Sequence, residues 1–279
     1  MHTLNLSSLI HDLTIPCADN GHEFIRTDRI SRIAELLTAS SYLLLDQLPL
    51  AFVWKHRDFN PDLPVVLVSS HIDSLYTRYH CCLENGLFLG TFDNSITNAA
   101  IIDRMLGNHL PPQVLVAFTG DEEENSRGAD QVMEILKSAP KPLHPEMVVV
   151  LDITEEAYKS HPFTFENLFR QKAPSPLVCL RFAEKKDLAA YLRATLDTDD
   201  LFIIKNGEPD ESWQYDEHDV NCCALCLPIL TVTGDMHDDS GVYAKEQSVF
   251  KYTETLSRFL SKIVAELQTI PTPIFYPIE

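Results

Sequence analysis

Imidazole and carboxylate side chains follow four apolar runs of this 279-residue chain, each at the point where the run ends. They are His71 and Asp73 after 65–70, the acidic run 121–124 after 113–119, Asp152 after 147–151, and His237 after 228–233. A fifth acidic position, Asp93, precedes an expected helix within the segment GTFDN. Because ligands bind at the carboxyl ends of the strands in open α/β sheets, we expect these side chains to lie close together at one edge of a sheet.

The side-chain types in this set favour divalent metal ions over a cluster that has no cation. Ionised carboxylates packed in a low-dielectric cleft would repel one another by several kcal/mol. Two histidines, two aspartates and one glutamate of 121–124 carry three negative charges, and two divalent ions carry four positive ones, which leaves about one unit to bind hydroxide. Mixed nitrogen and oxygen ligands suit zinc, with Co²⁺ or Mn²⁺ as substitutes. We therefore expect two Zn²⁺ ions roughly 3.5–4 Å apart, bridged by one carboxylate.

Each position also has an ordinary structural explanation when it is taken alone. A histidine after a strand, such as His71, is often a hydrogen-bonded surface group, and Asp93 or Asn94 would serve to cap the following helix. The acids 121–124 would be favoured by the dipole of a helix that begins just after them, and Asp152 would start a turn. These explanations do not account for the same ligand chemistry at the end of every long apolar run.

The elements that must position these side chains alternate between apolar runs and amphipathic segments. Four runs lack alternation, which is typical of strands covered by helices on both faces: 65–70, 113–119, 147–152 and 228–233. Helices are expected over 24–40, 95–106, 126–138, 185–196 and 246–268, a hairpin over 42–45 and 50–55, and strands over 177–182 and 201–205. We therefore expect an α/β fold, one domain over 1–279 with a central, mostly parallel mixed sheet flanked by helices on both faces. The less regular stretches 154–176 and 206–219 are expected insertions at one edge of that sheet.

The charge balance excludes several classes of partner. Lys and Arg total 22 against 41 Asp and Glu, which gives a net charge of −19. Such a surface repels phosphate backbones and anionic lipids, so we expect no nucleic-acid partner and no membrane partner. No apolar run approaches the ~20 residues of a membrane-spanning helix.

The cysteines and the N-terminal residues favour a cytoplasmic location. Seven cysteines are an odd number, and Cys81-Cys82 and Cys222-Cys223 are adjacent pairs, which is unusual for a disulfide framework. The first residues lack the basic start and continuous apolar stretch of a signal peptide. A zinc or redox role for Cys223 with Cys226 is an alternative, although no second ligand pair stands nearby.

In this order and spacing, the residues resemble the co-catalytic dinuclear zinc aminopeptidase family. That family includes secreted bacterial leucyl aminopeptidases and, more distantly, glutamate carboxypeptidase. Its pattern has His-x-Asp after a strand, Asp-Asn or Asp-Asp in a Gly-containing loop, Glu-Glu with a later Gly, a strand ending in Asp, and a late His. The matching residues are His71-Ile-Asp73, Asp93-Asn94, Glu122-Glu123 with Gly128, Asp152 and His237, and the resemblance spans roughly residues 64–263.

The resemblance implies a zinc-exopeptidase-like fold and a role for each matched residue. One metal ion would be held by His71, Asp93 and Asp152, and the other by Asp93, Glu123 and His237. Asp93 would therefore bridge the two ions, and a cis peptide bond would follow it.

The same resemblance implies how the reaction would proceed. Asp73 would accept a hydrogen bond from the far nitrogen of His71 and fix its tautomer. Glu122 would take a proton from a water activated by the two zinc ions and pass it to the leaving amine.

Two assignments within this pattern have alternatives. The run 121–124 permits a shift by one residue, so that Glu123 and Glu124 would replace Glu122 and Glu123. His218, which follows an irregular loop, is a rival of His237 as the late ligand. After His237 the chain reads Asp-Asp-Ser, which departs from the usual pattern of the family.

The function favoured by these residues is that of a zinc-dependent metallopeptidase, a hydrolase acting on peptide bonds. The short segment between His71 and Asp93 leaves no room for an inserted domain, which favours the single-domain aminopeptidases, exopeptidases that release N-terminal residues. The expected substrate is a peptide or a small amide. A carboxypeptidase, a deacylase or a glutaminyl cyclase would use a similar site, and a non-catalytic scaffold on the same fold is a further alternative. Candidate pocket walls contain Tyr158, Phe163, Phe165, Phe169, Trp213 and Tyr215.

Overall fold

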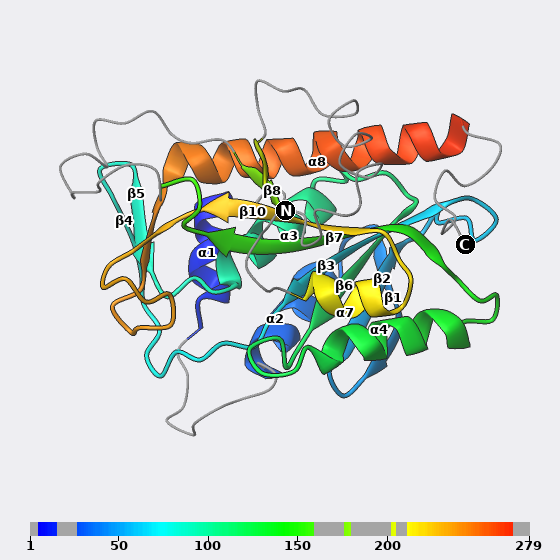
Figure 1. Ribbon diagram of the computed structural model, residues 1–279, viewed down its shortest axis with the longest axis horizontal. Helices are drawn as coiled ribbons and strands as arrows, with labels where there is room; N and C mark the ends of the chain where they lie inside the picture. Colours follow the sequence, from blue (N-terminus) through cyan, green and yellow to red (C-terminus); the bar gives the residue numbers. More distant parts are fainter. Residues whose placement is uncertain (1–4, 16–26, 159–175, 180–201, 205–210, 270–279) are drawn as a thin grey trace.

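A central sheet of eight strands runs through the protein (Figure 1). The computed structural model describes residues 5–15, 27–158, 176–179, 202–204 and 211–269. In spatial order the strands are β1 (Tyr42–Leu48), β2 (Ala51–His56), β6 (Val114–Thr119), β3 (Val65–His71), β7 (Pro145–Thr154), β10 (Cys222–Pro228), β8 (Leu177–Cys179) and β9 (Phe202–Ile204).

The middle of the sheet is parallel. Strands β6, β3, β7 and β10 are parallel neighbours, with His71 opposite Thr119 and Ser69 opposite Val150. The hairpin β1–β2 adds antiparallel to β6, and β8 adds antiparallel to β10. The predicted mostly parallel mixed sheet is therefore confirmed. Because the four central strands share one direction, their carboxyl ends lie at the same edge.

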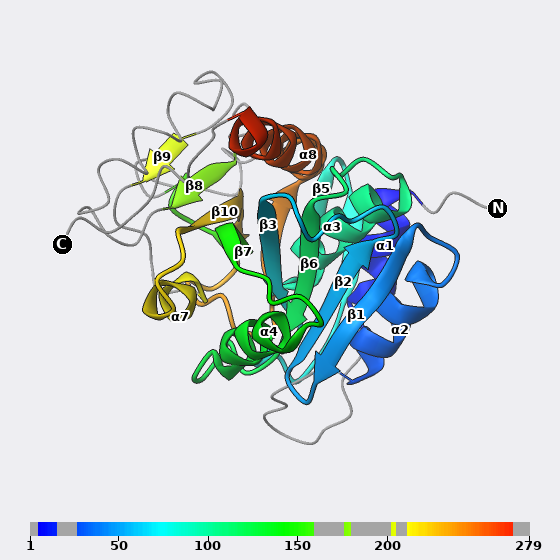
Figure 2. The ribbon, with the colours of Figure 1, turned by 90° about the vertical axis from the view of Figure 1, so that its right-hand side faces the viewer.

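Helices cover both faces of the sheet, as Figure 2 shows. One face carries α1 (Leu6–Leu13), α2 (Thr27–Leu37), α3 (Ser95–Leu106) and α8 (Glu246–Thr269), and the other carries α4 (Arg127–Ser138) and α7 (Ser212–Glu217). Helical spacing explains the burial: α4 buries Ala129, Val132, Met133 and Leu136, which lie on one side of the helix. Alternate residues of the central strands face the two helical layers, so every residue of β3, β6 and β10 is buried.

A second, smaller sheet is antiparallel and stands beside the carboxyl end of the central sheet (Figure 1). Its strands, in spatial order, are β11 (Leu230–Thr231), β12 (Val242–Lys245), β5 (Leu87–Gly90) and β4 (Cys81–Glu84). The loop 232–241 joins β11 to β12 and contains His237. Gly241 ends this loop at φ +76, where an added Cβ would lie 2.3 Å from the Gly90 carbonyl oxygen, so the close approach of the two segments requires glycine.

Most expected elements are present with small shifts of their ends. The helices expected over 95–106, 126–138 and 246–268 are α3, α4 and α8, and the helix expected over 24–40 contains α2. The expected hairpin is β1–β2. The helix expected over 185–196 lies outside the described residues, as do most of the expected insertion 154–176 and the first five residues of the expected insertion 206–219. The described part of the second insertion forms α7, which packs on α4 and β10.

The prediction that residues 228–233 form a buried strand of the central sheet is wrong. The buried strand of the central sheet is β10, which begins six residues earlier and ends at Pro228. Beyond it, only Leu230 and Thr231 form a strand, and that strand, β11, belongs to the second sheet. The apolar sequence continues from 222 to 231 without interruption, so its pattern alone does not show where one strand stops.

Cys223 and Cys226 both lie on strand β10. Cys223 packs in the hydrophobic cluster with α8, and Cys226 packs in the cluster with α4, so they face opposite sides of β10 and cannot chelate one ion. Among the described cysteines, Cys81, Cys82, Cys222, Cys223 and Cys226 form no disulfide.

In the described part of the chain, no helix has the length and apolarity needed to span a bilayer.

Candidate metal centre

Two histidines, His71 and His237, lie close to the two carboxylate oxygens of Asp93. The Nε2 atom of His71 lies 3.2 Å from Asp93 Oδ1, and the Nε2 atom of His237 lies 3.6 Å from Asp93 Oδ2. The two histidines are 166 positions apart in sequence; His71 ends a strand of the central sheet, and His237 lies on the loop that joins β11 to β12. Asp93 thus stands between two separate nitrogen donors.

The first donor group consists of the buried residues His71 and Asp93 and the half-buried Asp152, and it lies at the ends of β3 and β7. Asp152 Oδ1 lies 3.8 Å from His71 Nε2, and ligand atoms of His71, Asp93 and Asp152 all lie within 4.8 Å of one another. On the other side of the ring, His71 Nδ1 lies 3.4 Å from Asp73 Oδ1. The imidazole therefore has a carboxylate near each nitrogen, and its Nε2 atom points toward the shared aspartate.

The second donor group is built from two loops. Glu123 Oε2 lies 3.2 Å from His237 Nε2, and ligand atoms of Asp93, Glu123 and His237 lie within 4.8 Å of one another. Glu122 lines the same cavity and lies within the same range of His71 and Glu123. All five predicted ligands, together with Glu122, therefore surround one cavity.

These separations and the unsatisfied atoms fit a pair of divalent cations. Tetrahedral ligands held at about 2.0–2.2 Å from zinc lie roughly 3.3–3.6 Å from one another, which is close to the distances around Asp93. Three buried atoms of the cluster, His71 Nδ1, Asp93 Oδ1 and Glu123 Oε1, have no hydrogen-bond partner. Buried polar atoms normally have partners, so these orphaned atoms support a role as metal ligands or as supports of ligands.

The electrostatics of the cluster show a shortage of positive charge. Burial raises the pKa of Glu123 and of Asp152, and the nearby Asp93 carboxylate raises both further. Burial opposes ionisation of Asp93 as well, but the neighbouring His237 and His71 imidazoles outweigh it and lower its pKa. The carboxylates of Asp93 and Glu123 in turn raise the pKa of His237 to about 11. Cations held by these carboxylates would reduce the repulsion between the buried negative charges.

Glu122 has the character of a proton acceptor. Burial raises the pKa of its carboxyl group well above the usual range, the Asp152 and Glu123 carboxylates raise it further, and His71 opposes them. A carboxylate with a raised pKa accepts a proton more readily near neutral pH, and bound cations would offset part of the rise.

The four acids of the loop 121–124, which follows β6, have different surroundings. Asp121, at φ +67, is fully buried and accepts hydrogen bonds from the guanidinium group of Arg127. Glu122 and Glu123 line the cavity next to the histidines, and Glu124 is exposed at its rim. The geometry therefore places Glu123, and not Glu124, beside His237.

Gly128 fixes the position of this loop. A Cβ at Gly128 would lie 2.5 Å from the Gly120 carbonyl oxygen and 2.8 Å from the Leu50 carbonyl oxygen. Because this contact admits no side chain, the first turn of α4 packs directly on the end of β6. The loop that carries Glu123 is held between them.

The start of α3 ties the ends of β3 and β7 together. The Asn94 side chain donates to the Leu151 carbonyl oxygen at 2.7 Å, and the Asn98 side chain donates to the His71 carbonyl oxygen at 2.8 Å. Asn94 occupies the N-cap position but makes no capping hydrogen bond with its side chain. The peptide bond between Asp93 and Asn94 is cis. Asn98 was not identified from the sequence, although a polar side chain in an apolar helical stretch is a signal of such a role.

A further buried acid, Glu211, was also missed. Its Oε2 atom accepts a hydrogen bond from Ser69 Oγ at 2.7 Å, and Ser69 Oγ accepts one from the Tyr215 hydroxyl at 2.9 Å. Ser69 lies two residues before His71 on β3. Burial raises the pKa of Glu211 to about 7 although the hydrogen bond from Ser69 lowers it. The acidic, irregular sequence around Glu211 gave no signal that this carboxyl group is buried.

His218, the rival ligand, lies away from the cluster. Its Nε2 atom is 2.8 Å from Asp130 Oδ1 on α4, and His218 does not line the cavity. The structure therefore brings His237, and not His218, to the other donors.

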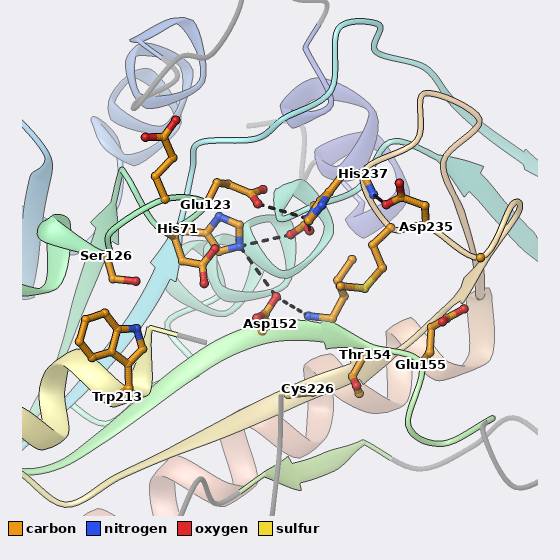
Figure 3. Close-up of a pocket in the computed structure, with 16 residues that line it drawn as sticks. His71, Glu123, Ser126, Asp152, Thr154, Glu155, Trp213, Cys226, Asp235 and His237 are labelled. Carbon is orange, nitrogen blue, oxygen red and sulfur yellow. Dashed lines mark hydrogen bonds and ion pairs between the residues drawn. The ribbon is translucent and has the colours of Figure 1, made fainter. Parts of the chain in front are cut away.

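The cavity around the cluster has a volume of ≈ 760 Å³ and two ends. In Figure 3, Trp213 and Ser126 lie at one end, Glu155 and Asp235 lie at the other, and His71 lies between them. Its described lining also contains Glu124, Ile153, Thr154, Cys226, Gly234 and Met236, and includes no Lys or Arg.

Three of the aromatic residues expected in the pocket walls lie in the described part of the chain, and one of these three lines the cavity. Trp213 does so, whereas Tyr215 and Tyr158 are buried in hydrophobic clusters. The expected residues Phe163, Phe165 and Phe169 lie outside the described part of the chain.

Comparisons with known proteins show the fold. No protein-family model matches the chain, and no curated protein matches it. Among solved structures, the TET1 peptidase of Pyrococcus horikoshii, which can assemble into a tetrahedron or an octahedral shell, aligns with a TM-score of 0.66 and 11% identity over 92% of this chain and 99% of that chain. The aminopeptidase PepT of Bacillus cereus aligns at 0.63 and 8% over 95% and 100%. An endoglucanase of Thermotoga maritima aligns at 0.61 and 13% over 92% and 99%.

The chain therefore has the fold that the sequence resemblance implied, an α/β fold found in aminopeptidases. At such low identity the likeness concerns the fold alone. The names of these structures cover more than one activity, so the chemistry has to be argued from the residues of the cavity.

Proposed function

We propose that the protein is a metal-dependent aminopeptidase that uses two Zn²⁺ ions to release the N-terminal residue of a peptide. The observation that carries this proposal is the arrangement around Asp93, whose two oxygens face two different histidines. A carboxylate that bridges two metals needs one oxygen for each ion, and each ion needs its own terminal ligands. The donor groups on the two sides of Asp93 supply these ligands.

Each residue of the cluster has a role in this proposal. His71 and Asp152 complete one ion position and Glu123 and His237 the other, while Asp73 orients His71. When bound, the two ions would supply a water of lowered pKa and would polarise the scissile carbonyl group.

Proton transfer falls to Glu122. Its carboxylate takes the proton of the attacking water and delivers it to the nitrogen of the leaving amine. Its place in the cavity, outside both donor groups that share Asp93, leaves its oxygens available for this transfer.

The charge of the cavity favours an aminopeptidase over a carboxypeptidase. Recognition of a terminal carboxylate normally uses a guanidinium or ammonium group, and the described lining of the cavity contains no Lys or Arg. The carboxylates of Glu124, Glu155 and Asp235 suit a terminal ammonium group instead.

A panel of fluorogenic substrates tests the proposal. Zinc-loaded protein should release the fluorophore from aminoacyl substrates with a free α-amine, and acetylation of that amine should abolish turnover. Equal cleavage of the acetylated substrates would point to a deacylase or another amide hydrolase, and cleavage from the carboxyl end of N-blocked peptides would point to a carboxypeptidase. Absence of both bound metal and turnover would support a non-catalytic scaffold.

A further inference from the structure

His237 differs from the other proposed ligands in the way the fold holds it. His71 and Asp152 lie on strands of the central sheet, whereas His237 lies on the loop 232–241 of the second sheet. The His71 side chain is 3% exposed and the His237 side chain is 38% exposed. Packing therefore fixes His71, and something other than packing has to fix His237.

Hydrogen bonds from the segment after β3 hold the His237 loop on both sides of the histidine. On the N-terminal side, the buried Tyr76 hydroxyl donates to the Met236 carbonyl oxygen at 2.5 Å. On the C-terminal side, Asp239 accepts hydrogen bonds from the segment 77–78.

The Asp239 contacts use both carboxylate oxygens. Asp239 Oδ1 accepts from the backbone N–H groups of Thr77 at 2.9 Å and Arg78 at 3.2 Å, and Asp239 Oδ2 accepts from the Thr77 hydroxyl. A carboxylate that accepts several hydrogen bonds holds its partners more firmly than a neutral acceptor does. These contacts join the loop 232–241 to the residues that directly follow His71 and Asp73.

The neighbouring acid, Asp238, makes no such connection. Its Oδ1 atom accepts from the Ser240 N–H group at 2.8 Å, within the same loop. Asp238 and Asp239 therefore carry the same type of side chain one and two positions after His237, but only Asp239 is bonded to the segment after β3. This difference supplies a matched control.

We propose that Tyr76 and Asp239 are positioning residues that clamp the His237 loop and so set the affinity of the second ion position. The proposal rests on the dinuclear site of the proposed function. It assigns a role to the Asp-Asp-Ser sequence after His237, and it makes the two ion positions unequal. The ion between His71, Asp93 and Asp152 depends on the central sheet, and the ion at His237 depends on the clamp.

Zinc titration of the metal-free full chain tests this inference. Wild type and Asp238→Ala should each bind two ions. Asp239→Ala should bind the first ion with unchanged affinity and the second about 10- to 100-fold more weakly, the usual cost of losing a residue that supports a ligand. Tyr76→Phe should also weaken the second ion, and it should weaken the first to a smaller extent because the Tyr76 hydroxyl interacts with the backbone of Asp93 as well. Asp239→Asn, which keeps one acceptor oxygen, should fall between Asp239→Ala and wild type.

Two results would overturn the clamp. One is a second-ion affinity in Asp239→Ala and Tyr76→Phe equal to that of Asp238→Ala, and the other is an equal loss at both ion positions in Asp239→Ala. Tyr76→Phe keeps the buried ring, so it guards against a folding defect in Asp239→Ala, and circular dichroism reports the fold of each variant. A wild-type protein that binds fewer than two ions would instead contradict the proposed function, so the two failures are distinguishable.

Discussion

The two halves of the candidate metal centre are built in opposite ways. One half, His71 with Asp152, stands on adjacent parallel strands whose neighbours on both faces are helices. The other half, Glu123 with His237, stands on two loops, one of them part of a small antiparallel sheet. Asp93 belongs to both. The edge of a sheet therefore preorganises ligands by packing, whereas loops need individual hydrogen bonds to hold their ligands in place.

Glu122→Gln should have the largest effect on activity and should leave zinc binding at both halves of the centre unchanged. We expect turnover to fall by about 10²- to 10⁴-fold, because the variant cannot accept the proton of the attacking water. Zinc content should remain that of wild type, since Glu122 lies outside both donor groups that share Asp93. Substrate turnover and elemental analysis of the same preparation check this. Wild-type rates in the variant would remove Glu122 from the mechanism.

Removing one histidine from each half should give unequal results. His237→Ala should keep one tightly bound zinc ion per chain, because the donors on the central sheet remain. His71→Ala should keep none that is tightly bound, because the remaining nitrogen donor, His237, lies on a loop and its side chain is 38% exposed. Competition with a zinc-binding dye measures both affinities. Equal losses in the two variants would show that the halves do not differ as proposed.

Chelation should remove the two ions in two steps. We expect the ion at the loop half to leave first, and most of the zinc-dependent stability to remain until the second ion leaves. Each ion present at 100 times its Kd adds about 2.7 kcal/mol to the free energy of unfolding. Zinc content and urea unfolding, followed over a series of chelator concentrations, test the order. A single step for both ions would contradict it.

Glu211 offers a smaller, pH-dependent test of the half built on β3. Its pKa is about 7 in the folded protein, above the ordinary value of 4.5, so the folded state binds more protons than the unfolded state between these values. The contribution of Glu211 to stability therefore decreases as the pH rises through this range, and Glu211→Gln should gain stability relative to wild type by about 2 kcal/mol between pH 5 and pH 8.

Urea unfolding of the metal-free wild type and Glu211→Gln at the two pH values measures this difference. The other titrating groups are shared by the two proteins, so their contributions cancel. A stability difference that does not change with pH would show that Glu211 is ionised in the fold.

The strands and helices that could be predicted from the sequence are those whose hydrophobic pattern extends over many residues. The buried central strands are apolar without alternation, and the polar residues at their ends stand out against that background, as His71 and Asp152 do. The helices α4 and α8 are amphipathic and show a helical period in the sequence, whereas α3 is buried on most sides. The meeting of these strand ends then follows from the parallel topology.

The remaining parts could not be predicted because they depend on short elements and single contacts. The strands β11 and β12 have two and four residues, too few to show a period, so the sheet that carries His237 was missed. Asp239 and Glu211 are acids in acidic loops, and only the fold shows that one bonds to the segment 77–78 and the other is buried.

Anomalous scattering at the zinc edge, from crystals grown with Zn²⁺, would locate the metal ions in the cavity. We expect two peaks roughly 3.5–4 Å apart, one on each side of Asp93, with His71 bonded to one ion and His237 to the other. A single peak, or zinc bound away from Asp93, would contradict this expectation.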